Sequence, residues 1–127
     1  MVYDVKIPLL GFENIKKMTL EKVDDIFMKL DDYEKSGISF TLIDPFAIRE
    51  YEFDLPKDDA KKLDITKESE LLIYNIMIIQ NPIENSTINF LAPLIFNKSK
   101  KIMGQIVLDN NIYKDYGIIE YISNYLS

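Results

Sequence analysis

Two stretches of this chain combine β-forming residues with a proline that interrupts them. Residues 39–46 read SFTLIDPF, and residues 86–97 read STINFLAPLIFN. Proline has no N–H to donate to a neighbouring strand, so Pro45 and Pro93 each mark a strand end, a bulge or the edge of a sheet. The chain must therefore use short strands at these places, and neither stretch carries catalytic chemistry.

Further segments have the apolar pattern of β-strands. The pattern predicts strands at residues 2–7, 38–43, 71–79, 86–91, 94–96 and 102–108. The almost unbroken apolar run at residues 71–79 favours a central strand buried on both faces, with a buried helix as the alternative. Residues 21–30 fit a helix or a strand, and we interpret them as a polar turn followed by a strand. We expect a hairpin loop at residues 31–37 and a basic turn at residues 98–101, within a β-meander.

Two short helices complete the prediction. Residues 57–63 are predicted to form a helix. Asp54 is its N-cap candidate, and Pro56 suits a position near its first turn. In the tail, four apolar residues fall close to one helical face: Ile118, Ile122, Tyr125 and Leu126. We expect one all-β domain over residues 1–127, mainly antiparallel and either barrel-like or a sandwich. It carries one short internal helix and a short C-terminal helix that packs over a barrel end or a sheet edge.

The composition favours a soluble cytoplasmic protein. A chain of 127 residues can bury roughly two-thirds of its unfolded surface, and 47% hydrophobic and 28% charged residues are ordinary values for a globular domain. No apolar run approaches the ~20 residues that span a bilayer, and the first twelve residues do not resemble a signal peptide. The net charge of −6 argues against nucleic-acid binding, which depends on Lys and Arg, and favours a basic partner.

The missing residue types exclude most catalytic chemistry. The chain has no histidine, cysteine or tryptophan, so it lacks the usual general base, the commonest metal ligand and the thiolate nucleophile. Three acid pairs occur, at residues 24–25, 31–32 and 58–59, and we expect each to lie on an exposed polar stretch. The acidic residues 31–34 lack the ligand spacing and glycine of a calcium loop. We expect no enzyme activity, no metal and no cofactor.

Several motifs together carry a family resemblance that covers nearly the whole chain. They are Leu9, Gly11 and Phe12; Phe40, Leu42 and Ile43 before Pro45 and Phe46; Tyr51, Glu52 and Phe53; Thr87 and Asn89 before Leu91, Ala92 and Pro93; and Asn97 and Gln105. In this order and spacing the chain resembles the FliW family of flagellar assembly factors. Asp44 stands where asparagine is commoner in that family, a change that keeps the turn propensity.

The resemblance implies a fold and a function. FliW proteins are small antiparallel β-barrel-like domains that bind flagellin and the translational repressor CsrA, the carbon storage regulator. The resemblance implies that the protein is a noncompetitive antagonist of CsrA. Secretion depletes flagellin and so frees the protein to bind CsrA, which couples flagellin translation to flagellin secretion. The alternative is a chaperone-like flagellin-binding protein without a regulatory role.

A surface at strand ends and turns is the expected binding site, because binding residues concentrate there. The candidate partner-binding residues are Phe46, Tyr51, Phe53, Pro93 and Asn97. Singly, each has an alternative interpretation: Phe46 and Phe53 as core residues, and Pro93 and Asn97 as residues that shape a turn.

Overall fold

The structure, a computed structural model, describes residues 1–34, 36–117 and 119–125. Its strands are β1 (Val2–Ile7), β2 (Lys17–Lys22), β3 (Phe27–Asp32), β4 (Ser39–Ile43), β5 (Leu71–Ile78), β6 (Thr87–Ile88), β7 (Leu94–Asn97), β8 (Ile102–Gln105) and β9 (Glu120–Tyr121). The helical elements are α1 (Lys57–Lys62) and the 3₁₀ turns η1 (Pro45–Ala47), η2 (Ile83–Asn85) and η3 (Ile122–Asn124). Among the residues described, no helix has the length and apolar character needed to cross a membrane.

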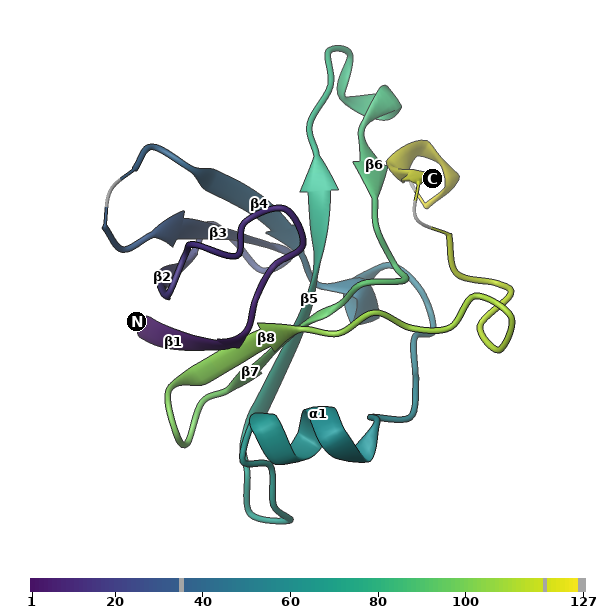
Figure 1. The fold of residues 1–127 in the computed structure, drawn as a ribbon. Helices are drawn as coiled ribbons and strands as arrows, with labels where there is room; N and C mark the ends of the chain where they lie inside the picture. Colours follow the sequence, from purple (N-terminus) through teal and green to yellow (C-terminus); the bar gives the residue numbers. More distant parts are fainter. Residues whose placement is uncertain (35, 118, 126–127) are drawn as a thin grey trace.

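Seven strands close into a barrel in the order β4-β3-β2-β1-β8-β7-β5, and the pairing of β5 with β4 completes the ring (Figure 1). Neighbouring strands are antiparallel except for β1 and β8, which are parallel. β5 is the longest strand and makes three pairings. It pairs with β4 along one edge, and with first β7 and then β6 along the other.

Alternation along the strands fills the barrel with apolar side chains. Met18, Leu30, Leu42 and Phe96 are fully buried inside it, with Tyr3 beside the Phe96 ring. Burial of a leucine of this kind contributes about 1.5–3 kcal/mol. This interior core explains why the short strands predicted from the sequence hold together.

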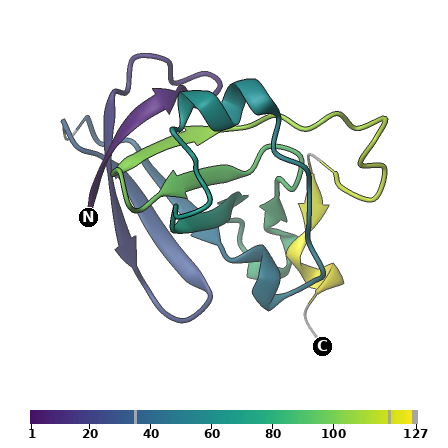
Figure 2. The same cartoon turned by 90° about the horizontal axis from the view of Figure 1, so that it is seen from below.

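A second apolar layer covers the outer side of β5. There Met77 and Ile43 pack with Tyr51, Ile88 and Phe90, which come from the segment after η1 and from around β6. Farther along the barrel, a third cluster centres on Leu63, Leu91, Ile95, Ile106 and Leu108. Figure 2 shows α1 lying across the barrel strands at this side. The chain from residue 44 to residue 65 therefore wraps the barrel rather than joining its sheet.

The structure confirms the strand at residues 2–7, the hairpin into β4 and the β7–β8 meander with its turn at residues 98–101. β5 is central, as predicted, but the expectation that it is buried on both faces is wrong. Only Asn75 and Met77 in it are buried, and Ile78, which lies past the end of the ladder with β4, is 58% exposed. β6 is also shorter than predicted, with only two residues in the ladder.

The helical expectations hold in outline. α1 starts after Pro56, which occupies the N-cap position, and Asp54 makes no cap. Asp58 and Asp59 lie in its first turn and Lys61 and Lys62 in its last, as the helix dipole favours. The C-terminal helix is a single 3₁₀ turn, η3, and Ile118 and Leu126 of the predicted apolar face lie outside the described residues.

The expected exposure of the acid pair at residues 31–32 is wrong. Both residues belong to the end of β3 rather than to the loop, and Asp32 is only 8% exposed. Asp32 accepts a hydrogen bond from the backbone N–H of Glu34, 3.1 Å away, which orders the start of the hairpin turn. The alternation of side chains along a strand places the two acids on opposite faces.

Candidate functional site

The segment from residue 50 to residue 56 follows η1 as extended chain and lies between the barrel and the tail. Tyrosine hydroxyls of the tail bind its backbone. The Tyr116 hydroxyl donates to the Glu52 carbonyl at 2.7 Å and accepts from the Glu52 N–H at 2.9 Å, while the Asp54 N–H donates to the Tyr113 hydroxyl at 2.7 Å. The Tyr113 and Tyr116 rings are stacked, with centroids 5.7 Å apart. The tail therefore fixes this segment in the way a neighbouring strand would.

Tyr51 is the buried anchor of the same segment. Its hydroxyl donates to the Phe90 carbonyl at 2.5 Å and accepts from Asn75 Nδ2 at 3.2 Å. Burial, the largest effect, raises the pKa of Tyr51 well above its usual value, so the phenol stays neutral. Its side chain is 5% exposed and acts as a structural hydrogen-bonding group.

Arg49 lies against three aromatic rings. Its guanidinium carbon is 4.9 Å from the Phe90 ring centroid, 4.8 Å from that of Tyr116 and 5.8 Å from that of Tyr125. Nη1 donates to the Tyr125 hydroxyl at 3.1 Å and lies 3.7 Å from Glu120 Oε1. Planar stacking and charge pairing together suit arginine and not lysine. Arg49 therefore joins the barrel side of the site to its tail.

Tyr125 and Glu120 complete this contact. The Tyr125 hydroxyl donates to Glu120 Oε1 at 2.5 Å. Burial first, and then the hydrogen bond to Glu120 and the nearby carboxylate charge, raise the pKa of Tyr125 to about 12. Tyr125 thus remains uncharged at physiological pH.

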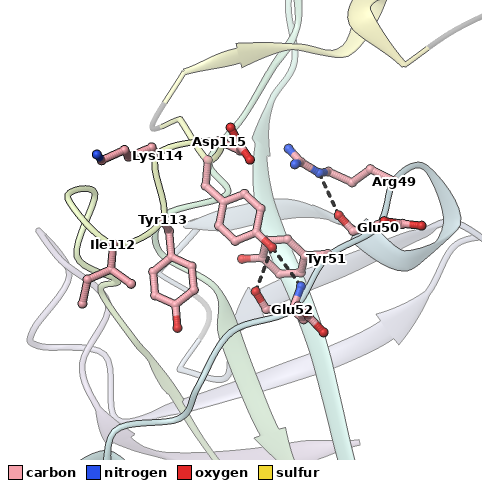
Figure 3. A pocket seen from close by; sticks show the side chains of 9 residues that line it. Arg49, Glu50, Tyr51, Glu52, Ile112, Tyr113, Lys114 and Asp115 are labelled. Atoms are coloured by element: carbon pink, nitrogen blue, oxygen red, sulfur yellow. Dashed lines mark hydrogen bonds between the residues drawn. The ribbon is translucent and has the colours of Figure 1, made fainter.

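A pocket of about 610 Å³ opens between Arg49–Glu52 and Ile112–Tyr116 (Figure 3). Figure 3 shows Arg49 and Glu50 on one side of it and Tyr113 and Lys114 on the other. The lining mixes both charge signs with tyrosine rings, a combination that can bind the backbone and side chains of a peptide. In the chain outside residues 35, 118 and 126–127, no group of three or more acids is placed to hold a metal ion.

The structure brings three of the five predicted site residues together. Phe46, Tyr51 and Phe53 form one group, with ring centroids 6.0 Å apart for Phe46 and Tyr51 and 5.6 Å for Tyr51 and Phe53. Phe46 is 54% exposed, Phe53 is half-buried and Tyr51 is buried. We call these three residues the Tyr51 cluster, and Phe46 is the member that a partner can reach.

The other two predicted residues lie elsewhere and are buried. Pro93 precedes β7, and its carbonyl accepts the Ile106 N–H at 2.9 Å. Asn97 Nδ2 donates to the carbonyls of Leu63 at 2.8 Å and Asp64 at 3.2 Å, at the end of α1. The Asn97 side chain thus holds α1 against the barrel.

Sequence reasoning missed Arg49, Tyr113, Tyr116 and Glu120. One signal was available, because Arg49 is the only arginine in the chain and is separated from the YEF motif by one residue. The tail is also rich in tyrosine, at positions 113, 116, 121 and 125. That these two segments meet depends on the closed barrel and could not be read from their spacing.

The fold and the site define a small closed β-barrel protein whose tail binds an extended surface segment. The model of the family described as FliW protein matches residues 1–119, and this chain belongs to the FliW family. It is 48% identical over 127 residues to Flagellar assembly factor FliW 2 of Wolinella succinogenes, covering 100% of this chain and 93% of that relative. It is also 48% identical over 126 residues to Flagellar assembly factor FliW of Sulfurimonas denitrificans, covering 99% of this chain and 98% of that relative.

A solved structure agrees with this assignment. A crystal structure of the flagellar assembly factor FliW superposes with a TM-score of 0.85 at 26% sequence identity, covering 95% of this chain and 84% of the other. The family model ends at residue 119, so Glu120 and Tyr125, which bind Arg49, lie just past the matched region.

Proposed function

We propose that this protein is a cytoplasmic flagellar assembly factor that binds flagellin and the translational repressor CsrA. In this account it catalyses no reaction. It antagonises CsrA noncompetitively and so couples flagellin translation to flagellin secretion. The observation that carries the proposal is membership of the FliW family along residues 1–119.

The charge balance supports an antagonist of an RNA-binding protein. A repressor that holds RNA must present basic residues to phosphate, whereas this chain has a net charge of −6. An acidic body docked beside an RNA-binding surface raises the free energy of bringing phosphate close without filling that surface. This is a physical route to noncompetitive inhibition.

The structure refines which acids can serve in a test of this effect. In the acid pairs at residues 24–25 and 31–32, Asp32 is buried in β3, and Asp24 accepts the backbone N–H groups of Ile26 and Phe27, both at 2.8 Å. Reversing either charge would disturb the fold. Asp25 has a side chain that is 97% exposed, so Asp25→Lys together with Glu21→Lys reverses charge at the surface.

Charge reversal should weaken the inhibition of RNA binding while the protein remains folded. The experiment measures CsrA–RNA affinity by gel shift at matched salt, with and without the Asp25→Lys, Glu21→Lys variant. Lys67→Glu, an exposed charge reversal of opposite sign in the segment after α1, is the matched control. Unchanged inhibition by the double variant would reject the electrostatic contribution.

A chaperone-like flagellin-binding protein is the alternative. The exposed ring of Phe46 beside the large pocket suits capture of an apolar partner segment and requires no second partner. Titration with CsrA separates the two functions, because only the regulatory protein binds it. Phe46→Ala should weaken flagellin binding about tenfold if this surface is used, and unchanged affinity would remove Phe46 from the site.

A further inference from the structure

A second surface, which shares no lining residue with the large pocket, carries exposed apolar side chains. A groove of about 280 Å³ lies where β3 and β4 face the hairpin between β5 and β6. Its apolar lining comes from Val23, Phe27, Met28, Ile79 and Ile83, and we call it the apolar groove. Val23 is 63% exposed, and Ile79 and Ile83 are each 51% exposed.

The groove exists because two paired strands separate. The ladder between β4 and β5 runs from Ile43↔Asn75 to Thr41↔Met77 and stops there, although β4 begins at Ser39 and β5 continues to Ile78. Beyond that point the β5–β6 hairpin projects away from the barrel, as Figure 1 shows at its top. Ser39 and Thr41 of β4 and Ile79 of the hairpin then face the same open space.

Several exposed apolar residues around one groove are unlike isolated apolar residues on a surface. Val23, Ile79 and Ile83 all line this one groove and are each more than half exposed. A contiguous apolar surface rimmed by polar residues typically marks an interaction site. Phe27 also packs against the second apolar layer, the one that contains Ile43 and Met77. This contact fixes the position of its ring in the groove.

The rim of the groove, meaning the charged residues in and next to its lining, is mostly acidic. Lys29 lines the groove itself and is paired with Asp31 at 3.4 Å, and Lys22, next to Val23 in the sequence, is paired with Asp25 at 3.3 Å. Asp24 and Glu84, next to Val23 and Ile83, have no such partner among residues 1–34, 36–117 and 119–125. Backbone N–H groups of Ile26 and Phe27 lower the pKa of Asp24, which keeps this carboxylate charged. The rim therefore complements a basic partner.

We propose that the apolar groove is the docking site for CsrA, through an apolar segment of the repressor flanked by basic residues. This assignment rests on the proposed function and adds to it the surface that is used. Of the two partners, the RNA-binding one must carry basic residues to hold phosphate, so it matches the acidic rim. The groove is separate from the Tyr51 cluster and the large pocket, whose lining residues it does not share.

The test substitutes lysine for exposed groove residues, which removes apolar contact and opposes a basic partner. Val23→Lys and Ile79→Lys are the two variants, and Glu84→Gln removes one rim charge. Val107→Lys is the matched control, because Val107 is 59% exposed and does not line the groove. Each purified full-length variant is compared with the unaltered protein by circular dichroism and then titrated calorimetrically with CsrA and with flagellin.

We expect Val23→Lys and Ile79→Lys to weaken CsrA binding at least about tenfold, as loss of a central apolar contact does. We expect Glu84→Gln to weaken it less and to reduce its dependence on salt. Val107→Lys should bind as the unaltered protein does. Two differently placed lysine variants keep the test informative if one of them unfolds.

Three outcomes would overturn the assignment. If the unaltered protein binds CsrA and both groove variants bind it equally well, the groove is not the docking site, although the proposed function stands. If the groove variants lose flagellin but keep CsrA, the occupant is flagellin. If the unaltered protein binds no CsrA at all, the regulatory function and the assignment fail together.

Discussion

The Nη1 atom of Arg49 lies 3.7 Å from the Oε1 atom of Glu120. This ion pair links the chain after η1 to the last strand, β9. Both side chains are less than one-fifth exposed, at 18% and 19%. Phe90, Tyr116 and Tyr125 surround the guanidinium, so the pair is shielded from solvent screening. The tail is thus held to the barrel by one charged contact within an aromatic environment.

Replacing Arg49 should loosen the tail. We expect Arg49→Met to lower the free energy of unfolding by about 2 kcal/mol, because it removes the ion pair and the ring contacts and leaves Glu120 unpaired. Arg49→Lys should cost less, since the charge remains. Urea unfolding followed by circular dichroism measures both. As a control, Lys100→Met breaks the exposed pair with Asp64 and should change stability by less than about 0.5 kcal/mol; an equal effect would contradict the account.

Gly104 fits the parallel contact of β8 with β1, and a side chain there should destabilise the barrel. A Cβ atom at this position would lie 2.6 Å from the Ile7 Cβ. We expect Gly104→Ala to cost about 1–3 kcal/mol through overpacking. A double-mutant cycle with Ile7→Gly, which removes that Cβ atom, measures the coupling: the second substitution should recover part of the loss, and strictly additive effects would place the strain elsewhere.

The raised pKa of Tyr125 makes stability fall at high pH. The folded pKa of about 12 exceeds the usual value of 10.0, so the unfolded chain loses this proton first. The stabilising contribution is complete below pH 10 and is lost as the pH rises from 10 to 12. Tyr51, whose pKa is also raised, acts in the same direction. Urea unfolding at pH 9 and pH 10.5 should show the decrease, and Tyr125→Phe should reduce it; a pH-independent midpoint would contradict the assignment.

Substitution of Asn97 should lower stability more than substitution of Phe46, although both were predicted as binding residues. Asn97→Ala leaves the carbonyls of Leu63 and Asp64 without their donor, and we expect a loss of about 1–3 kcal/mol. Phe46 is over half exposed, so Phe46→Ala should cost less than about 1 kcal/mol. Thermal unfolding of the two variants decides the order, and a reversed order would contradict the roles given to them.

The local elements were predictable from the sequence because their signals are local. The alternation at Val2–Ile7, the turn at residues 98–101 and the start of α1 after Pro56 depend on neighbouring residues alone. The family resemblance supplied the barrel, and the structure confirms it. The separation of β5 from β4 after Met77 was not predictable, because it depends on how two strands that are distant in the sequence pair.

The site was predicted only in part, for the same reason. Phe46, Tyr51 and Phe53 are near neighbours in the sequence, and they meet in space. Arg49 and Glu120 are charged residues whose burial depends on a contact between distant segments. A polar residue such as Asn97 suggests a surface until the carbonyl groups it binds are known. Such long-range hydrogen bonds give no periodic signal in the sequence.

The most direct test of the account is a pair of calorimetric titrations with CsrA from the same organism. The first uses the free protein, and the second uses the protein saturated with flagellin. The account predicts that the free protein binds CsrA and that bound flagellin weakens this binding. Binding to flagellin alone would favour the chaperone-like function, and binding to neither partner would contradict the proposed function altogether.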